Sequence, residues 1–347
     1  MIYRYLIRPV LVQFSPETSM KASLNVLQFF RKIRLNFLLR LSHRKKVPSL
    51  SRTVFGIRFA NPVGLAAGID RNGEFYNTIS DMGFGFVEIG SLTRDGQDGN
   101  PKPRIFRLRK DNALAADTGY PNKGVRHAIR NIQKDRPNCP IAANLVCRQG
   151  NLSEDEITQD YRDAFALMYD FADFFVINTV MSPSLEADML EDVSVLSGVI
   201  DTVLDMRLCY DTYKPVLLKV SSDIPRESLK EIIDYARLSG IDGIVAASGT
   251  TSRDGLEHSR QRLEKTGPVR LSGAPLLNRN LETVRFISSY TGGNFPIIAS
   301  GGIMSPEDAA AMLEAGASLV EVCTGLLYRG PKIVKKTLKH LKNQNKQ

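Results

Sequence analysis

The sequence predicts a (β/α)8 barrel preceded by a small N-terminal helical extension. From residue 50 onward, eight short apolar runs alternate with eight stretches of helical spacing. The runs are apolar on both faces, which is typical of strands in a parallel sheet covered on both sides. A chain of 347 residues is long enough to form such a barrel as one unit.

The predicted elements follow one another regularly along the chain. The predicted strands are 63–67, 86–89, 141–145, 174–178, 216–220, 243–247, 296–300 and 318–323. The predicted helices are 73–82, 122–134, 155–171, 187–207, 225–239, 280–290, 306–315 and 332–342. A doubly wound open sheet is the alternative, and it is disfavoured because no G-x-G-x-x-G opens a helix after the first strand.

Three further segments complete the predicted barrel. Residues 52–61 have the pattern of a small hairpin that turns at Phe55-Gly56 and closes the barrel bottom. Long insertions at 90–120 and 248–278 follow the second and sixth strands. Loops after barrel strands lie at the catalytic face, so we expect the chemistry there.

The N-terminal segment carries the charge of the whole chain. The formal net charge is +9, and residues 1–50 alone contain ten Lys and Arg with one acid, Glu17, so the remaining chain is neutral. Ser15-Pro16-Glu17-Thr18 has the pattern of a helix start. We therefore divide the chain into a basic, amphipathic extension at 1–48 and a barrel at 49–347.

Two interpretations of the extension remain open from its pattern. Leucine and phenylalanine recur between the basic residues at spacings of three and four, which is typical of a helix lying in a membrane interface. The same pattern fits a helix packed on the barrel with a basic rim. Its many apolar residues argue against nucleic acid as a partner, and no apolar run is long enough for a membrane-spanning helix.

Glycine turns after the last two strands predict a phosphate site. Gly301-Gly302 follows the seventh strand, and Thr324-Gly325 follows the eighth. Backbone N–H groups in such turns can approach a phosphate closely. Ser272-Gly273 could add a third anion-binding turn, and Lys219 at the end of the fifth strand needs an anionic or electron-rich partner.

Several motifs resemble the dihydroorotate dehydrogenase family. The resemblance rests on Asn61–Gly68 (NPVGLAAG) with Asp70, on residues 99–108 (GNPKPRIFRL), and on Leu271-Ser272-Gly273 and Ser300–Ile303 in the same order. Residues 8–18 resemble the membrane-associated, quinone-dependent class 2 branch. The resemblance favours a peripheral membrane role on the cytoplasmic side for the extension, with quinone as the electron acceptor.

The resemblance implies FMN as the cofactor, bound over the barrel mouth. Lys219 would lie near the N1–C2=O region of the flavin and stabilise negative charge on the reduced form. The other positions that the resemblance assigns to the flavin ring, its polar edges and its phosphate are Ala66, Ala67, Gly68, Ser91, Asn144, Ser272, Gly273, Gly301, Gly302, Thr324 and Gly325.

The substrate side departs from the family pattern. The family binds orotate with four asparagines; Asn178 is retained, whereas Ala116, Ser184 and Ser248 stand at the other positions. Arg71 stands where the family has a substrate-binding lysine and keeps a cation for a carboxylate. Each unsatisfied polar partner costs about 1–3 kcal/mol, so we expect weak orotate binding unless other groups compensate.

Ser182 is the predicted catalytic base. In class 2 enzymes a serine before a proline removes the C5 proton while hydride leaves C6, and Ser182-Pro183 has this register if one residue is inserted after Asn178. The four histidines show no ligand spacing, so no metal is expected.

Three functions fit the sequence. The first is a quinone-linked oxidation of dihydroorotate to orotate in pyrimidine biosynthesis. The second is an FMN oxidoreductase of the same fold with another substrate. The third is a flavin-binding, membrane-associated protein without catalysis.

Overall fold

The computed structural model describes residues 8–11, 13–43, 46–180, 182–183, 193–257, 263 and 266–344. Its centre is a closed parallel barrel in which β3 is followed around the ring by β4, β9, β10, β11, β12, β14 and β15. The strands are β3 (Val63–Leu65), β4 (Phe86–Leu92), β9 (Ile141–Leu145), β10 (Phe174–Asn178), β11 (Val216–Val220), β12 (Gly243–Ala246), β14 (Ile297–Ser300) and β15 (Leu319–Val322). The predicted barrel is therefore confirmed, strand by strand.

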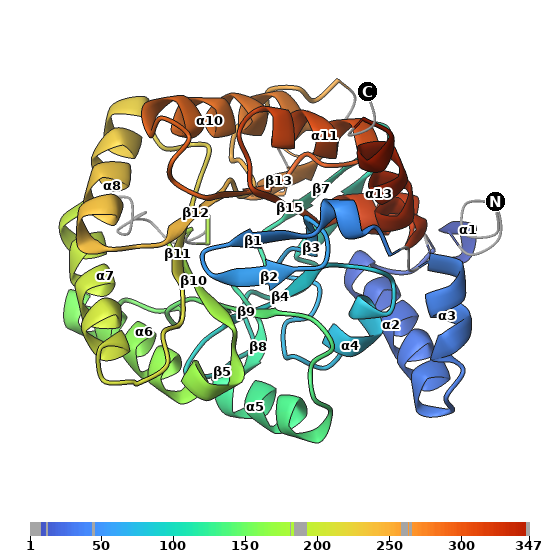
Figure 1. Ribbon diagram of the computed structural model, residues 1–347, viewed down its shortest axis with the longest axis horizontal. Helices are drawn as coiled ribbons and strands as arrows, with labels where there is room; N and C mark the ends of the chain where they lie inside the picture. Colours follow the sequence, from blue (N-terminus) through green and yellow to red (C-terminus); the bar gives the residue numbers. More distant parts are fainter. Residues whose placement is uncertain are drawn as a thin grey trace.

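Helices surround the barrel (Figure 1). They are α4 (Tyr76–Ser80), α5 (Val125–Lys134), α6 (Glu154–Met168), α7 (Val193–Arg207), α8 (Arg226–Ser239), α10 (Leu277–Tyr290), α11 (Pro306–Glu314), α12 (Thr324–Arg329) and α13 (Lys332–Gln344). Ser153 begins α6 with a capping box, because its hydroxyl accepts from the Glu156 N–H while the Glu156 carboxylate accepts from the Ser153 N–H. The first six residues of the helix predicted at 187–207 lie outside the described residues.

The predicted hairpin closes one end of the barrel. Strands β1 (Arg52–Val54) and β2 (Ile57–Phe59) pair antiparallel and lie across the barrel axis in Figure 1. Phe59 is fully buried, and its ring centroid lies 5.3 Å from that of Phe86 and 6.0 Å from that of Phe174. These aromatic side chains fill the hairpin end of the barrel, so a binding site is expected at the opposite end.

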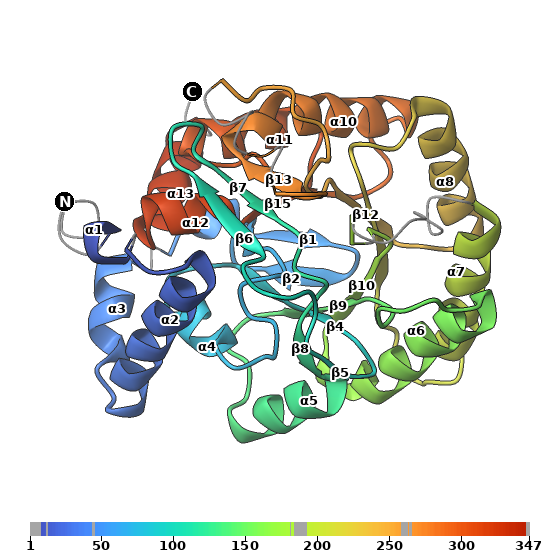
Figure 2. The same cartoon turned by 180° about the vertical axis from the view of Figure 1, so that it is seen from behind.

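Inserted strands cover that opposite end. Strands β6 (Ile105–Leu108), β7 (Ala113–Ala116) and β13 (Arg270–Gly273) form a three-stranded antiparallel sheet at the face turned to the viewer in Figure 2. A second small sheet pairs β5 (Asp95–Gln97) with β8 (Asn122–Gly124), so α5 begins at Val125 rather than at residue 122. The two long insertions meet here as sheet, where the sequence indicated only loops.

The N-terminal helices α1 (Arg8–Leu11), α2 (Pro16–Lys32) and α3 (Asn36–His43) precede the barrel and lie against one side of it, near α4 and α13. Ser15 caps α2 through its hydroxyl, as the Ser-Pro-Glu-Thr pattern predicted. Leu24 is buried in the main core, while Arg31 and Arg40 both form ion pairs with the buried carboxylate of Asp81. Two of the basic residues thus fasten the extension to the barrel. Within the described residues, no helix is both long and apolar enough to cross a membrane.

Candidate active site at the barrel mouth

Inward-facing side chains form two layers inside the barrel. Near the hairpin the layer is apolar and includes Phe86, Phe174 and Leu217. Side chains of a strand return to the same face every second residue, so the next inward layer holds Glu88 and Lys219, which follow Phe86 and Leu217 by two. The inward-facing side chains therefore change from apolar to ionisable between one layer and the next, two residues further along each strand.

Glu88 and Lys219 form a buried ion pair. The Lys219 Nζ lies 3.2 Å and 3.4 Å from the two carboxylate oxygens of Glu88. The same carboxylate accepts hydrogen bonds from the Asn144 amide and, at 3.3 Å, from the Ala67 backbone N–H. Burial raises the pKa of Glu88, but the Lys219 charge and these donors outweigh burial and hold its pKa below the usual value.

Glu321 adds a second carboxyl to this buried pair. It lies on β15, is 1% exposed, and both of its oxygens are buried without a hydrogen-bond partner among the described residues. Burial, with the adjacent negative charge of Glu88, raises the pKa of Glu321 well above its usual value. One ammonium faces two carboxyls, and their pKa values move in opposite directions, so Glu321 is the carboxyl that takes up a proton more readily.

Replacing Glu321 with glutamine is expected to stabilise the protein at high pH. A carboxyl whose pKa is raised by folding stabilises the native state below its unfolded pKa, near 4.5, and loses this contribution as pH rises through the folded pKa. The gain in unfolding free energy of Glu321→Gln over the unmodified protein should therefore grow from pH 5 to pH 9 in urea titrations. The exposed helical variant Glu231→Gln serves as the control and should show a flat difference. A gain that is equal at both pH values would contradict a raised pKa of Glu321.

A polar pocket opens above this layer. Ala66, Ala67, Gly68, Ser91 and Lys219 line it, together with Ser272, Gly273, Ser300, Gly301, Gly302 and Thr324. Asn144 has no exposed surface; its amide donates to Glu88, and its side-chain oxygen accepts from Asn178 at 3.3 Å. The structure thus brings together most of the residues that the sequence assigned to the flavin; Gly325 lies next to Thr324 but is not among the lining residues.

Glycines shape this pocket in two ways. Gly68 has φ +101°, and a Cβ built there would meet no atom within 4 Å, so the pocket wall stays open at this point. Gly301 and Gly302 have φ of +85° and +83°, and a Cβ on either would lie less than 3 Å from Asn280 or Leu277. The turn after β14 therefore requires glycine, and the Thr324 hydroxyl donates to Ser272 across it at 2.9 Å.

Arg71 is engaged by the N-terminal helix. Its Nη1 lies 3.0 Å from the carboxylate of Glu17, and its Nε donates to the Gly68 carbonyl at 3.1 Å. Arg104 binds the same Glu17 carboxylate at 2.7 Å. Arg71 still lines the polar pocket, but the structure gives it a partner on α2 that the sequence did not indicate.

Ser182 is buried beside an acid. Its hydroxyl donates to the Asp117 carboxylate, and the Asn100 side-chain amide donates to the Ser182 oxygen at 3.4 Å. Asn178 lines the pocket, and its amide donates to Ser91 at 3.1 Å. Ser248 also lines the pocket, whereas Ser184 lies outside the described residues.

Three groups near the pocket escaped the sequence analysis. Asp117 follows Ala116, where the chain departs from the family pattern, Glu321 lies within the predicted strand 318–323, and Arg270 lies within the insertion 248–278. Arg270 lines the pocket and pairs in register with Ala116 across β13 and β7. A polar residue inside an apolar strand was the available signal for Glu321; the sequence held none for the pairing of β13 with β7, which are far apart in the chain.

A second, apolar cavity of about 430 Å³ lies between α2 and the barrel. Residues from α2, β7, α12 and the loop after β3 form its wall: Met20, Ser23, Leu24, Leu27, Ile69, Leu114, Leu326, Leu327 and Tyr328 are among them. Gly68 and Thr324 of the polar pocket are close neighbours in sequence of Ile69 and Leu326 of the cavity. The two spaces therefore adjoin at the same strand ends.

Comparisons with known proteins agree with this geometry. The family model described as dihydroorotate dehydrogenase matches residues 49–344. A dihydroorotate dehydrogenase (quinone) of Christiangramia forsetii is 37% identical over 335 residues, covering 96% of this chain and 97% of the relative. One of Coxiella burnetii is 36% identical over 348 residues, covering 98% and 97%. The crystal structure of the Eimeria tenella dihydroorotate dehydrogenase with ferulenol has a TM-score of 0.79 and 31% identity, covering 86% of this chain and 85% of that one.

Proposed function

The chain belongs to the dihydroorotate dehydrogenase family, and we propose that it oxidises dihydroorotate to orotate and reduces a quinone, with FMN as the resident cofactor. The substrate loses a hydride from C6 and a proton from C5, and the quinone gains two electrons and two protons to become a quinol. The observation that carries this proposal is the polar pocket adjoining a separate apolar cavity. A polar ring and an apolar quinone need two such different surroundings.

The residues of the polar pocket fit FMN. Bound there, FMN would accept the hydride and release the electrons again. The open side of Gly68 leaves room for a planar ring, and the Lys219 ammonium provides the positive charge that a reduced flavin requires. Ser272, Gly273, Gly301, Gly302 and Thr324 offer hydroxyl and backbone donors for the phosphate.

The apolar cavity is the proposed quinone site. Blocking it with Ser23→Trp on α2 is expected to slow quinone reduction about 10- to 100-fold, since an indole in the cavity overlaps the space of the quinone, and overpacking of this kind costs about 1–3 kcal/mol. Bleaching of the flavin by dihydroorotate in the absence of oxygen should be unchanged. Steady-state quinone assays and anaerobic half-reactions measure the two steps separately.

Lys21→Trp is the matched control, because Lys21 is exposed on the same helix and is not among the residues lining the cavity. It should leave quinone reduction unchanged. Equal quinone reduction by the Ser23→Trp variant would show that the quinone enters elsewhere.

The extension is the proposed membrane-docking segment, with residues 1–48 and the barrel at 49–347 serving as its two functional units. Phe29, Phe30, Ile33, Phe37, Leu38 and Leu41 are exposed on and around α2 and α3. Lys32, Arg34 and Lys46 lie in the same segment. An exposed apolar face with a basic rim fits an anionic membrane surface, which would also deliver an apolar quinone to the cavity under α2.

Removing exposed apolar side chains from α3 should weaken membrane binding. Phe37→Ser with Leu41→Ser is expected to lower partitioning onto anionic vesicles about 10²- to 10⁴-fold, because burial of each of the two side chains contributes about 1.5–3 kcal/mol. Leu238→Ser is the control: this residue is 87% exposed on α8, on the other side of the barrel, against 75% for Leu41 (Figure 1). Vesicle sedimentation measures both, and equal binding by the double variant would remove α3 from the docking surface.

A further inference from the structure

Arg270 places an additional cation in the polar pocket. It begins β13, lines the pocket with Asn178, Lys219 and Ser248, and its side chain is only 11% exposed. Among the described residues, Arg71, Lys219 and Arg270 are the basic side chains that line this pocket. The resemblance assigns roles to Arg71 and Lys219 but none to Arg270.

The residues beside Arg270 are small at positions where the family pattern has asparagine side chains. Arg270 pairs with Ala116 across the antiparallel strands β13 and β7, so the two side chains lie on the same face of that sheet. On the loop after β12, a Cβ built on Gly249 would lie 3.4 Å from the Arg270 Cβ, and Ser248 precedes this glycine. Arg270 therefore lies between two positions that have lost asparagine.

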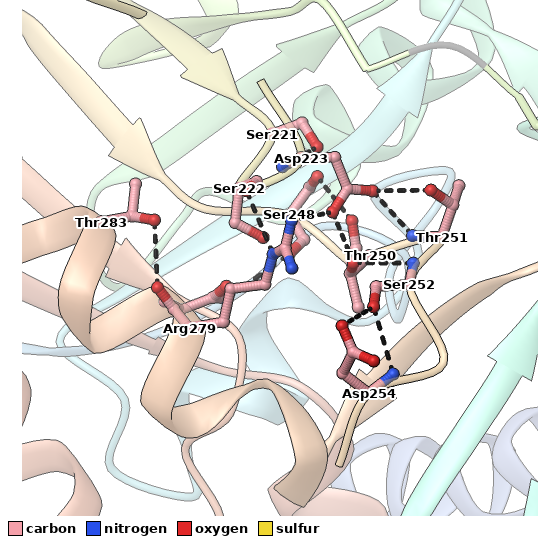
Figure 3. A network of polar contacts seen from close by, with 12 residues as sticks. Ser221, Ser222, Asp223, Ser248, Thr250, Thr251, Ser252, Asp254, Arg279 and Thr283 are labelled. Carbon is pink, nitrogen blue, oxygen red and sulfur yellow. Dashed lines mark hydrogen bonds and ion pairs between the residues drawn. The ribbon is translucent and has the colours of Figure 1, made fainter. Parts of the chain in front are cut away.

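The Asp223 carboxylate holds the Arg270 side chain in position at this side of the pocket. The Asp223 carboxylate lies 3.5 Å from Arg270 and 3.2 Å from Arg279, so one acid faces two guanidinium groups. Thr250 and Thr251 donate to the same carboxylate and fix its position (Figure 3). On the other side of the pocket, Glu17 likewise faces both Arg71 at 3.0 Å and Arg104 at 2.7 Å, whereas Lys219 lies 3.2 Å from Glu88.

We propose that Arg270, positioned by Asp223, binds the carboxylate of the substrate and replaces the amide donors lost at positions 116 and 248. A guanidinium offers five N–H donors in a planar fork, which suits a carboxylate. The proposal rests on the function proposed above, because it assigns the recognition of a carboxylate-bearing substrate to a named residue.

Ligand binding to the flavin-loaded full chain tests this assignment. Orotate, uracil (the same ring without the carboxylate) and benzoate (a carboxylate on another ring) are titrated while the flavin absorbance is followed. Arg270→Gln is expected to weaken orotate binding about 10- to 100-fold, as for loss of a charge-assisted hydrogen bond, and to leave uracil binding unchanged. Arg279→Gln is the matched control, since Arg279 pairs with the same Asp223 but is not among the residues lining this pocket; it should leave orotate binding unchanged.

Each outcome decides between the two proposals. If orotate binds Arg270→Gln and the unmodified protein equally, or if Arg279→Gln weakens orotate as much as Arg270→Gln does, the role of Arg270 is overturned and the proposed function stands. If the unmodified protein ignores orotate but binds benzoate in an Arg270-dependent way, Arg270 recognises carboxylates and orotate is not the product. If no ligand perturbs the flavin, both proposals fail.

A second variant applies if Arg270→Gln loses its flavin or melts at a lower temperature. Arg270→Lys keeps the positive charge but lacks the planar guanidinium, so it should still weaken orotate binding severalfold. Unchanged orotate binding by Arg270→Lys would overturn the role of Arg270.

Discussion

Replacing Lys219 with methionine is expected to abolish flavin retention and to lower the free energy of unfolding by about 3–5 kcal/mol at neutral pH. The Glu88 carboxylate has no exposed surface, and its ion pair is with Lys219 at 3.2 Å. Removing one partner of a buried pair leaves an uncompensated charge, which costs about that much. The absorbance spectrum of the purified variant and a urea titration measure the two effects.

The double variant Lys219→Met with Glu88→Gln separates the two effects. Because it removes both charges, it should recover most of the lost unfolding free energy but not the flavin, which still lacks the ammonium. A single variant that keeps its flavin at normal stability would show that the pair does not organise the site.

Replacing Ser182 with alanine is expected to slow flavin reduction by dihydroorotate about 10²- to 10⁴-fold, the usual contribution of a general base. The Ser182 hydroxyl donates to Asp117, so the acid can take the proton that the serine removes from C5. Asp117→Asn should slow the same step, because a neutral amide cannot accept that proton. Anaerobic stopped-flow absorbance measures the rate directly.

Ser80→Ala is the control for this series, since Ser80 is a buried serine on α4, away from the pocket. The rate of flavin reduction by Ser182→Ala should be low at every pH at which the unmodified protein is active, whereas the rate of Ser80→Ala should match that of the unmodified protein. A Ser182→Ala variant that reduces its flavin at the normal rate would exclude this serine as the base.

The barrel could be predicted because its physical signal is local. Each buried parallel strand, such as 141–145 or 174–178, is a continuous apolar run, and each helix carries its own periodicity. The hairpin at 52–61 was equally visible from its turn at Phe55-Gly56. These elements are confirmed nearly residue by residue.

The contacts that complete the site are not local. Glu17 and Arg71 are 54 positions apart, and no sequence pattern pairs an acid in a first helical turn with a loop arginine. The pairing of Arg270 with Ala116 joins two insertions across half the chain. Such contacts depend on how the loops pack over the barrel, and neither hydrophobic periodicity nor residue spacing predicts this packing.

Some residues of the site could be predicted in part. The glycine turns after β14 and β15 and Lys219 predicted the polar pocket, and the structure brings them together. The roles of Ser182, Asn178 and Ser248 stay predictions, and the loop that carries Ser184 lies outside the described residues. The role of Glu321 could not be predicted, because it depends on the contact of this carboxyl with Glu88 and Lys219, which lie on other strands.

The most direct test of the account is rapid mixing of the purified, flavin-loaded chain with dihydroorotate in the absence of oxygen. We expect the flavin absorbance to bleach in a single saturable phase and to return when a quinone is added. A protein that binds FMN, is bleached by a chemical reductant and reoxidised by quinone, yet shows no bleaching with any concentration of dihydroorotate, would contradict the proposed reaction.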